Sequence, residues 1–149
     1  MLSEIILTPE NLDQITLHIE SCLPEEACGL VGGIKQKANL VIPVENELHS
    51  QVRFRMAPLA QLQGFDQIET FGWELLAIFH SHPQGPEAPS PTDVAEFFYP
   101  GTAVIIASPL DRGDLSTRSA EGVAWGNWII NAFLIDHNRV HTIKLGLSA

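Results

Sequence analysis

Two histidines stand one residue apart at the end of an apolar run, and their spacing suits metal binding. The run from Leu75 to Phe79 leads directly into His80, which predicts a buried strand that ends at the histidines. Residues two apart on a strand point to the same face, so His80 and His82 can present both imidazoles to one ion while Ser81 turns away. The sequence therefore places two candidate metal ligands at the end of a rigid element.

Asp93 is the candidate for a third ligand. It follows a loop that contains Pro83, Pro86, Pro89 and Pro91, which limit the conformational freedom that is lost when the carboxylate is held near the imidazoles. Two neutral imidazoles and one carboxylate suit Zn²⁺, and three protein ligands leave a fourth position for water, as in catalytic zinc sites. Such an ion lowers the pKa of its bound water towards about 7 and polarises a substrate carbonyl.

Each half of this pattern also has an ordinary explanation. A His-x-His pair occurs by chance at strand ends, and Ser90-Pro91-Thr92-Asp93 is also a common helix start with Ser90 as its cap. The two halves in succession are more specific than either one alone. Their roles are compatible, because Ser90 can cap the helix while Asp93 turns towards the metal.

The whole segment resembles the signature of the JAMM (MPN+) metalloprotease family, H-x-H-P followed after six residues by S-x-x-D. It reads His80-Ser81-His82-Pro83, six residues, and Ser90-Pro91-Thr92-Asp93. The family also carries an upstream glutamate shortly before a Cys-Gly pair, and Glu26-Ala27-Cys28-Gly29 resembles that element. Glu25 is the alternative, although the spacing to Cys28-Gly29 favours Glu26.

The resemblance implies a site and a mechanism. Zinc would be held by His80, His82 and Asp93. Glu26 would act first as general base and then as general acid, and the Ser90 hydroxyl would help to stabilise the developing oxyanion.

The resemblance also implies a fold and a substrate class. We expect an α/β (α+β) fold of the MPN type, with one domain spanning residues 1–149 and a mixed, curved β-sheet with helices packed on it. The implied activity is that of a zinc isopeptidase or peptidase, which hydrolyses the amide bond after the C-terminal glycine of a ubiquitin-like or sulfur-carrier protein. Two alternatives stay open. One is a non-catalytic MPN-type interaction domain, although such domains have usually lost ligands, and the other is a zinc amidohydrolase of a small molecule.

The remaining sequence predicts the elements that must position these residues. Helices are predicted over about 9–22, where Thr8-Pro9 forms the start, and over about 58–71, with Leu59, Leu62, Phe65 and Ile68 on one face. Strands are predicted at 27–34, 38–44, 52–56, 75–79, 102–107, 128–136 and 139–145, the first two and the last two as hairpins. A short helix is expected from residue 90 to about 99, and a long surface loop over 109–127 that could lie beside the active site. Strands interleaved with helices imply a mixed sheet.

The composition of the chain limits the classes of partner that the protein is expected to bind. Hydrophobic residues make up 45% of the chain and charged residues 17%, which indicates one globular domain. A formal net charge of −10 disfavours nucleic acid as a partner. Charged or turn residues interrupt every apolar run, and no leader pattern is present, so we expect no membrane segment and a cytoplasmic protein. Cys22 and Cys28 are expected to be reduced thiols.

Two weaker signals receive ordinary interpretations. His137 and His141 straddle a predicted turn, so we do not expect a second metal site there. Trp125 and Trp128 could pack into the core or line a cleft, and we expect core packing.

Overall fold

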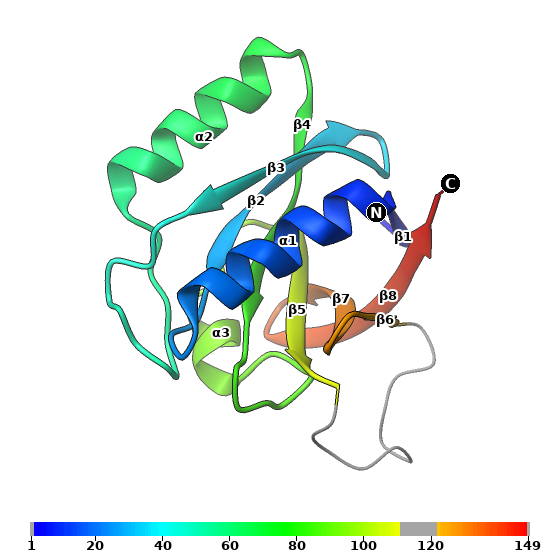
Figure 1. The fold of residues 1–149 in the computed structure, drawn as a ribbon. Helices are drawn as coiled ribbons and strands as arrows, with labels where there is room; N and C mark the ends of the chain where they lie inside the picture. The colour runs from blue at the N-terminus through cyan, green and yellow to red at the C-terminus, as the bar shows by residue number, and fades with distance from the viewer. Residues whose placement is uncertain (1, 111–121, 149) are drawn as a thin grey trace.

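The computed structural model describes residues 2–110 and 122–148 (Figure 1). These residues form three helices and eight strands. The helices are α1 (Pro9–Cys22), α2 (Pro58–Thr70) and α3 (Pro91–Ala95). The strands are β1 (Glu4–Leu7), β2 (Cys28–Ile34), β3 (Lys37–Val44), β4 (Glu74–Ser81), β5 (Ala103–Pro109), β6 (Val123–Trp125), β7 (Trp128–Asp136) and β8 (Arg139–Leu147).

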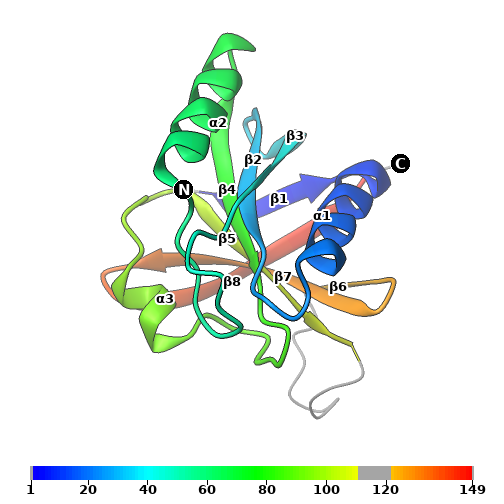
Figure 2. The same ribbon diagram turned by 60° about the vertical axis from the view of Figure 1, so that its left-hand side comes forward.

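All strands of the described residues belong to one mixed sheet, in the order β5-β4-β2-β3-β1-β8-β7-β6. Strand β1 runs parallel to β3 and β8, and β4 runs parallel to β5, whereas the other pairs are antiparallel. Strand β5 also pairs with β7, so the sheet curves back on itself (Figure 2). This architecture confirms the expected mixed, curved sheet.

The helices pack on opposite faces of this sheet. Leu12, Ile15 and Ile19 of α1 form the main core with side chains from β1 to β5, β7 and β8. On the other face, Ile68 of α2 packs against β2, β3 and β4, and Val94 of α3 packs against β5 and β7. The face that carries α2 and α3 is the one on which the metal-binding candidates lie.

The start of α1 follows the prediction. The Thr8 hydroxyl accepts a hydrogen bond from the Asn11 amide at 3.0 Å, and Asn11 Oδ1 accepts one from the Thr8 amide at 3.0 Å. Pro9 occupies the first turn, where its missing N–H leaves no unmet partner. This reciprocal cap fixes where the helix begins.

The buried face of α2 differs from the prediction. Leu59 and Leu62 are 68% and 56% exposed, whereas Ile68 is 3% exposed. Successive helical residues turn by about 100°, so Leu59 and Ile68 lie on roughly opposite sides of the helix. The buried face instead includes Gly64, where an added Cβ would lie 2.6 Å from Leu30 Cδ1. Because a helical turn has about 3.6 residues, positions spaced three apart rotate gradually around the helix and leave the face that packs against the sheet.

The predicted strand over 52–56 is wrong. Within the described chain, these residues contribute only an isolated bridge between Met56 and Asn46, and residues 45–57 form a loop between β3 and α2. The alternating pattern has another cause. Phe54 and Met56 turn inwards, while Arg53 and Arg55 stay exposed and form ion pairs.

Most other boundaries are confirmed. The first helix, both hairpins and the strands before His80 and after Asp93 lie where they were expected. Strands β1 and β6 were not predicted, and α3 ends at Ala95 rather than near residue 99. Strand β6 lies inside the segment predicted as a loop over 109–127, so that prediction is wrong at 123–125. Residues 111–121 of that segment, and with them the expectation of an active-site flap, lie outside the described residues.

None of the helices in residues 2–110 and 122–148 is long and apolar enough to cross a bilayer.

The two sides of α2 should respond differently to truncation. Ile68→Ala should lower the free energy of unfolding by about 2–5 kcal/mol, because it leaves a cavity between α2 and the sheet. Leu62→Ala, on the exposed side, should change it by less than about 0.5 kcal/mol. Urea denaturation followed by circular dichroism measures both, and equal losses would contradict this assignment of faces.

Candidate metal centre

Strand β4 positions the two histidines. His80 is paired with Cys28 of β2 on one side and with Ile106 of β5 on the other. The His82 amide, just beyond the strand, donates to the Ala107 carbonyl at 2.9 Å, so the same alignment with β5 continues. The side chains of His80 and His82 are 1% and 5% exposed and lie on the face that carries α2 and α3.

The start of α3 positions Asp93. Its amide donates to Ser90 Oγ at 3.0 Å, and its Oδ2 accepts from the Ser90 amide at 2.8 Å, which forms a capping box. The same Oδ2 atom lies 3.0 Å from His82 Nε2 and 3.8 Å from His80 Nε2. The helix cap and the approach to the histidines therefore use one carboxylate together.

These three side chains suit a zinc ion. His82 Nδ1 lies 2.8 Å from the Pro86 carbonyl, to which it can donate, so Nε2, which donates to Asp93 when no ion is bound, would be the nitrogen that offers its lone pair to a metal. In a tetrahedral zinc site with bonds of about 2.0–2.1 Å, ligand atoms lie about 3.3–3.4 Å apart. The two distances from Asp93 Oδ2 bracket that value. Two imidazoles and one carboxylate are also a common donor set for zinc.

The electrostatics keep Asp93 ionised. Burial raises the pKa of Asp93, but the hydrogen bond from His82 and the nearby His80 outweigh burial and bring it down to about 2. Burial lowers the pKa of His82, but its hydrogen bonds with Asp93 and with the Pro86 carbonyl outweigh burial and raise it. A charged carboxylate beside two imidazoles is thus available to a cation near neutral pH.

Glu26 approaches His80 from the other ring nitrogen. Its side chain is 4% exposed, and its Oε1 lies 3.6 Å from His80 Nδ1. Neither of these two atoms has a hydrogen-bond partner among the described residues. Glu26, His80 and His82 also offer donor atoms that all lie within 4.8 Å of one another, so Glu26 could approach an ion as well as Asp93. A buried carboxylate oxygen without a hydrogen bond is unfavourable, and such groups are often functional.

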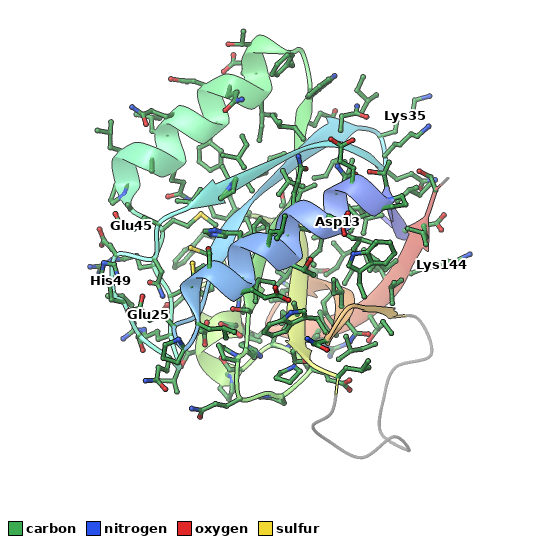
Figure 3. All side chains as sticks on the ribbon, in the orientation of Figure 1. Asp13, Glu25, Lys35, Glu45, His49 and Lys144 are labelled. Carbon is green, nitrogen blue, oxygen red and sulfur yellow. The ribbon has the colours of Figure 1, made fainter. Side chains whose placement is uncertain are left out.

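The two neighbouring glutamates, Glu25 and Glu26, lie in different surroundings. Glu25 is 36% exposed and pairs with His49 at 3.1 Å, and His49 also contacts Glu45 at 3.5 Å. Figure 3 shows these three residues together at the surface, on one side of the molecule. Glu26 is therefore the glutamate that lies beside the histidines.

Three residues of the site were missed in the sequence. Ser81, between the histidines, accepts a hydrogen bond from the Ala27 amide at 2.9 Å, so it fastens the residue after Glu26. Phe54 stacks on the His80 ring with centroids 4.4 Å apart and an interplanar angle of 27°. Asn46 donates to the Glu26 carbonyl at 3.0 Å. Alternation along the strand predicts that Ser81 faces away from the metal, but no local pattern identifies Phe54 or Asn46.

A cavity of about 380 Å³ opens beside the site. His80 and Asp93 line it, and much of the remaining wall is apolar and includes Phe54, Phe97 and Tyr99. This volume lies in the range of pockets that hold a small ligand or a short peptide segment.

Comparison with known proteins identifies the family. Residues 8–121 match the family model described as prokaryotic homologs of the JAB domain. The chain belongs to this family. The matched range contains the site residues from Glu26 to Asp93.

Two curated relatives of this JAB-family chain have described activities. The chain is 40% identical over 94 residues to a probable TtuB-protein conjugate cleaving protease of Thermus thermophilus, with 62% of this chain and 63% of the relative covered. It is 30% identical over 89 residues to a desampylase of Pyrococcus furiosus, with 60% and 64% covered. The chain thus spans less than two thirds of the length of either relative.

Two solved structures share the fold. Protein DSY2949 of Desulfitobacterium hafniense aligns with a TM-score of 0.78 and 30% identity, over 97% of this chain and 92% of the other. AF2198, a JAB1/MPN domain protein of Archaeoglobus fulgidus, aligns with a TM-score of 0.58 and 18% identity, over 99% and 100%. The second likeness concerns the fold alone.

The histidine pair and the tryptophan pair singled out in the sequence of this JAB-family chain lie between β6 and β8. His137 lies in the β7–β8 turn and His141 on β8, both exposed, and no further group of three candidate ligands occurs in the part of the chain that the structure describes. Trp128 is 4% exposed, and Trp125 packs against the core around α1. Core packing is confirmed for Trp128, whereas Trp125 is only partly buried.

The two thiols should differ in reactivity. Cys28 is fully buried, and burial, with smaller contributions from Cys22 and Glu26, raises the pKa of its thiol to about 12. At pH 8 iodoacetamide should therefore modify the half-buried Cys22 and leave Cys28 intact until denaturant is added. Peptide mass spectrometry measures this, and alkylation of Cys28 in the native protein would contradict its burial.

Proposed function

We propose that this chain is a zinc-dependent peptidase that hydrolyses the amide bond after the C-terminal glycine of a ubiquitin-like or sulfur-carrier protein. The observation that carries the proposal is the convergence of His80, His82 and Asp93 beside the buried Glu26. The substrate class is supported by the two relatives, one named for cleaving TtuB-protein conjugates and the other a desampylase. Two free thiols favour a reducing compartment, and we propose the cytoplasm.

The residues divide into ligands and proton carriers. His80, His82 and Asp93 would hold the zinc ion, because the Nε2 atoms of both histidines face the Asp93 carboxylate. When bound, zinc makes water a stronger nucleophile and polarises the scissile carbonyl. Glu26 has a carboxylate oxygen without a partner among the described residues, so it is free to accept a proton from the attacking water. It would then return that proton to the leaving amine.

Ser90 would assist at the carbonyl oxygen. Its Oγ accepts a hydrogen bond from the Asp93 amide, so its own O–H remains available to donate. A positioned donor of this kind stabilises the charge that develops on the oxygen. The cap and the oxyanion donor can therefore be the same hydroxyl.

A zinc amidohydrolase of a small molecule is the second candidate. The cavity of about 380 Å³ beside His80 and Asp93 favours it, because a compact apolar pocket can enclose a small substrate. Cleavage of a carrier protein, but not of short amides with the same scissile bond, would decide for the peptidase.

Metal content tests the ligand set. The purified protein should contain about one zinc ion per chain, and His80→Ala and Asp93→Ala should each lose most of it, because each leaves only two protein ligands. His137→Ala is the control, since that side chain is 90% exposed and belongs to the turn between β7 and β8. Elemental analysis measures the content, and unchanged zinc in both ligand variants would rule out this site.

Glu26→Gln tests the proton carrier. An amide cannot carry the proton, so turnover of a carrier-protein conjugate should fall by a factor of about 100 or more while zinc content stays unchanged. Glu25→Gln is the matched control and should keep wild-type turnover, because Glu25 pairs with His49 at the surface. Retained activity in Glu26→Gln, or its loss in Glu25→Gln, would remove Glu26 from this role.

A further inference from the structure

The 45–57 loop contains one buried asparagine with an unusual set of contacts. Asn46 is 6% exposed and lies two residues after the end of β3. Its Nδ2 donates to the Glu26 carbonyl at 3.0 Å and to the Arg53 carbonyl at 3.1 Å. Its Oδ1 accepts from the Leu48 amide at 3.1 Å and from the Arg55 amide at 3.1 Å. An amide side chain has two donor hydrogens and two acceptor lone pairs, so all of its capacity is used.

Three of these bonds organise the loop, and the fourth leaves it. The bonds to Leu48, Arg53 and Arg55 hold the two arms of the 45–57 loop against each other. The bond to the Glu26 carbonyl reaches the segment just before β2, 20 residues away in the sequence. A residue needed only to shape the loop would not require this contact.

The 45–57 loop therefore forms hydrogen bonds with both the carbonyl and the amide of Glu26. Asn46 binds its carbonyl, and the Ser50 carbonyl accepts from its amide at 2.8 Å. The Glu26 Oε1 atom has no hydrogen-bond partner among the described residues. Oε1 lies 3.6 Å from His80 Nδ1 but makes no hydrogen bond to any described residue, so the direction of the carboxylate depends in large part on how its backbone is held.

The same amide also supports the ring that covers His80. Phe54 lies between Arg53 and Arg55, and Asn46 binds the carbonyl of the first and the amide of the second. Phe54 stacks on the His80 ring at 4.4 Å and lines the cavity beside it. One side chain thus links the backbone of Glu26 to the residue that packs on a candidate ligand.

We propose that Asn46 is a positioning residue, which aligns the Glu26 carboxylate with the reacting water by holding the Glu26 backbone to the 45–57 loop. This inference rests on the proposed function, because it assumes that Glu26 carries the proton. Asn46 does not line the cavity beside His80 and Asp93, and it would act only through Glu26 and the loop. Small displacements of a catalytic group can slow a reaction by a factor of about 100.

Two substitutions separate the donor bonds of Asn46 from its acceptor bonds within the loop. Asn46→Ala removes all of the amide's bonds. Asn46→Asp keeps an acceptor for the amides of Leu48 and Arg55 but loses both donor bonds, to the Glu26 carbonyl and to the Arg53 carbonyl. Asn11→Ala is the control, because Asn11 is also 6% exposed and hydrogen-bonded, but it caps α1. All three variants are assayed zinc-loaded on a carrier protein whose C-terminal glycine bears a fluorogenic amine.

The expected result is a change in kcat rather than in KM. Asn46→Ala and Asn46→Asp should each lower kcat by about 10- to 100-fold with KM nearly unchanged, and both should retain zinc. Asn11→Ala should lower the melting temperature and leave kcat at the wild-type value. A wild-type kcat in folded, zinc-loaded Asn46→Asp would overturn the proposal. This test remains valid even when Asn46→Ala fails to fold.

Hydrogen exchange distinguishes failure of this inference from failure of the proposed function. The Glu26 amide, bonded to Ser50 of the loop, should exchange about tenfold faster in Asn46→Asp than in the wild type. If the wild-type protein cleaves no carrier protein, the proposed function fails, and the exchange rate still tests whether Asn46 holds Glu26. Unchanged exchange at Glu26 would overturn the positioning role by itself.

Discussion

The site depends on one junction, where the start of β2 meets the end of β4. Ser81 binds Ala27 twice, because its amide donates to the Ala27 carbonyl at 3.0 Å and its hydroxyl accepts from the Ala27 amide at 2.9 Å. Ser81 lies between the two histidines, and Ala27 follows Glu26 directly. This pair of bonds therefore sets the distance between a carboxylate and two imidazoles that are more than 50 residues apart in the sequence.

Burial gives this junction its chemical character. Glu26, His80 and His82 are each 5% exposed or less, so their interactions are weakened little by water. The same burial is unfavourable for a carboxylate whose oxygen lacks a partner among the described residues. A bound cation would offset part of that unfavourable term, and metal and fold should stabilise each other. The paired strands around the site must be rigid to keep the Glu26 carboxylate and the two imidazoles close together.

The ligand set could be read from the sequence because it is local. His80, His82 and Asp93 fall within one short segment, and the helix start that holds Asp93 has its own recognisable pattern. The supporting residues could not be read in this way. The Asn46 side chain binds the backbone at Arg53 and Arg55 beside an isolated bridge to Met56, so the 52–56 segment has strand-like alternation without forming a strand.

The fold shows the same division between local and distant information. Long apolar runs such as β4 and β7 were predicted, because each carries enough pattern by itself. Strand β1 has only four residues and is held as a strand by its pairing with β3 and β8, which its own composition does not reveal. The buried side of α2 is likewise decided by Gly64, which lets the helix approach Leu30, rather than by the leucines of α2.

Because β1 pairs with β8, the sheet cannot be completed until the last part of the chain has been synthesised. Ile5 pairs with Leu145, and the indole of Trp125 donates to Asp13 of α1 at 2.9 Å across 112 residues of sequence. Contacts this distant close last, because a long loop must lose its freedom before they form. A nascent chain on the ribosome would already hold every residue of the metal centre while the strands that close the sheet were still unmade. Premature metal capture by those residues would therefore act on an open sheet, which makes the interval before β7 and β8 emerge the vulnerable stage of synthesis.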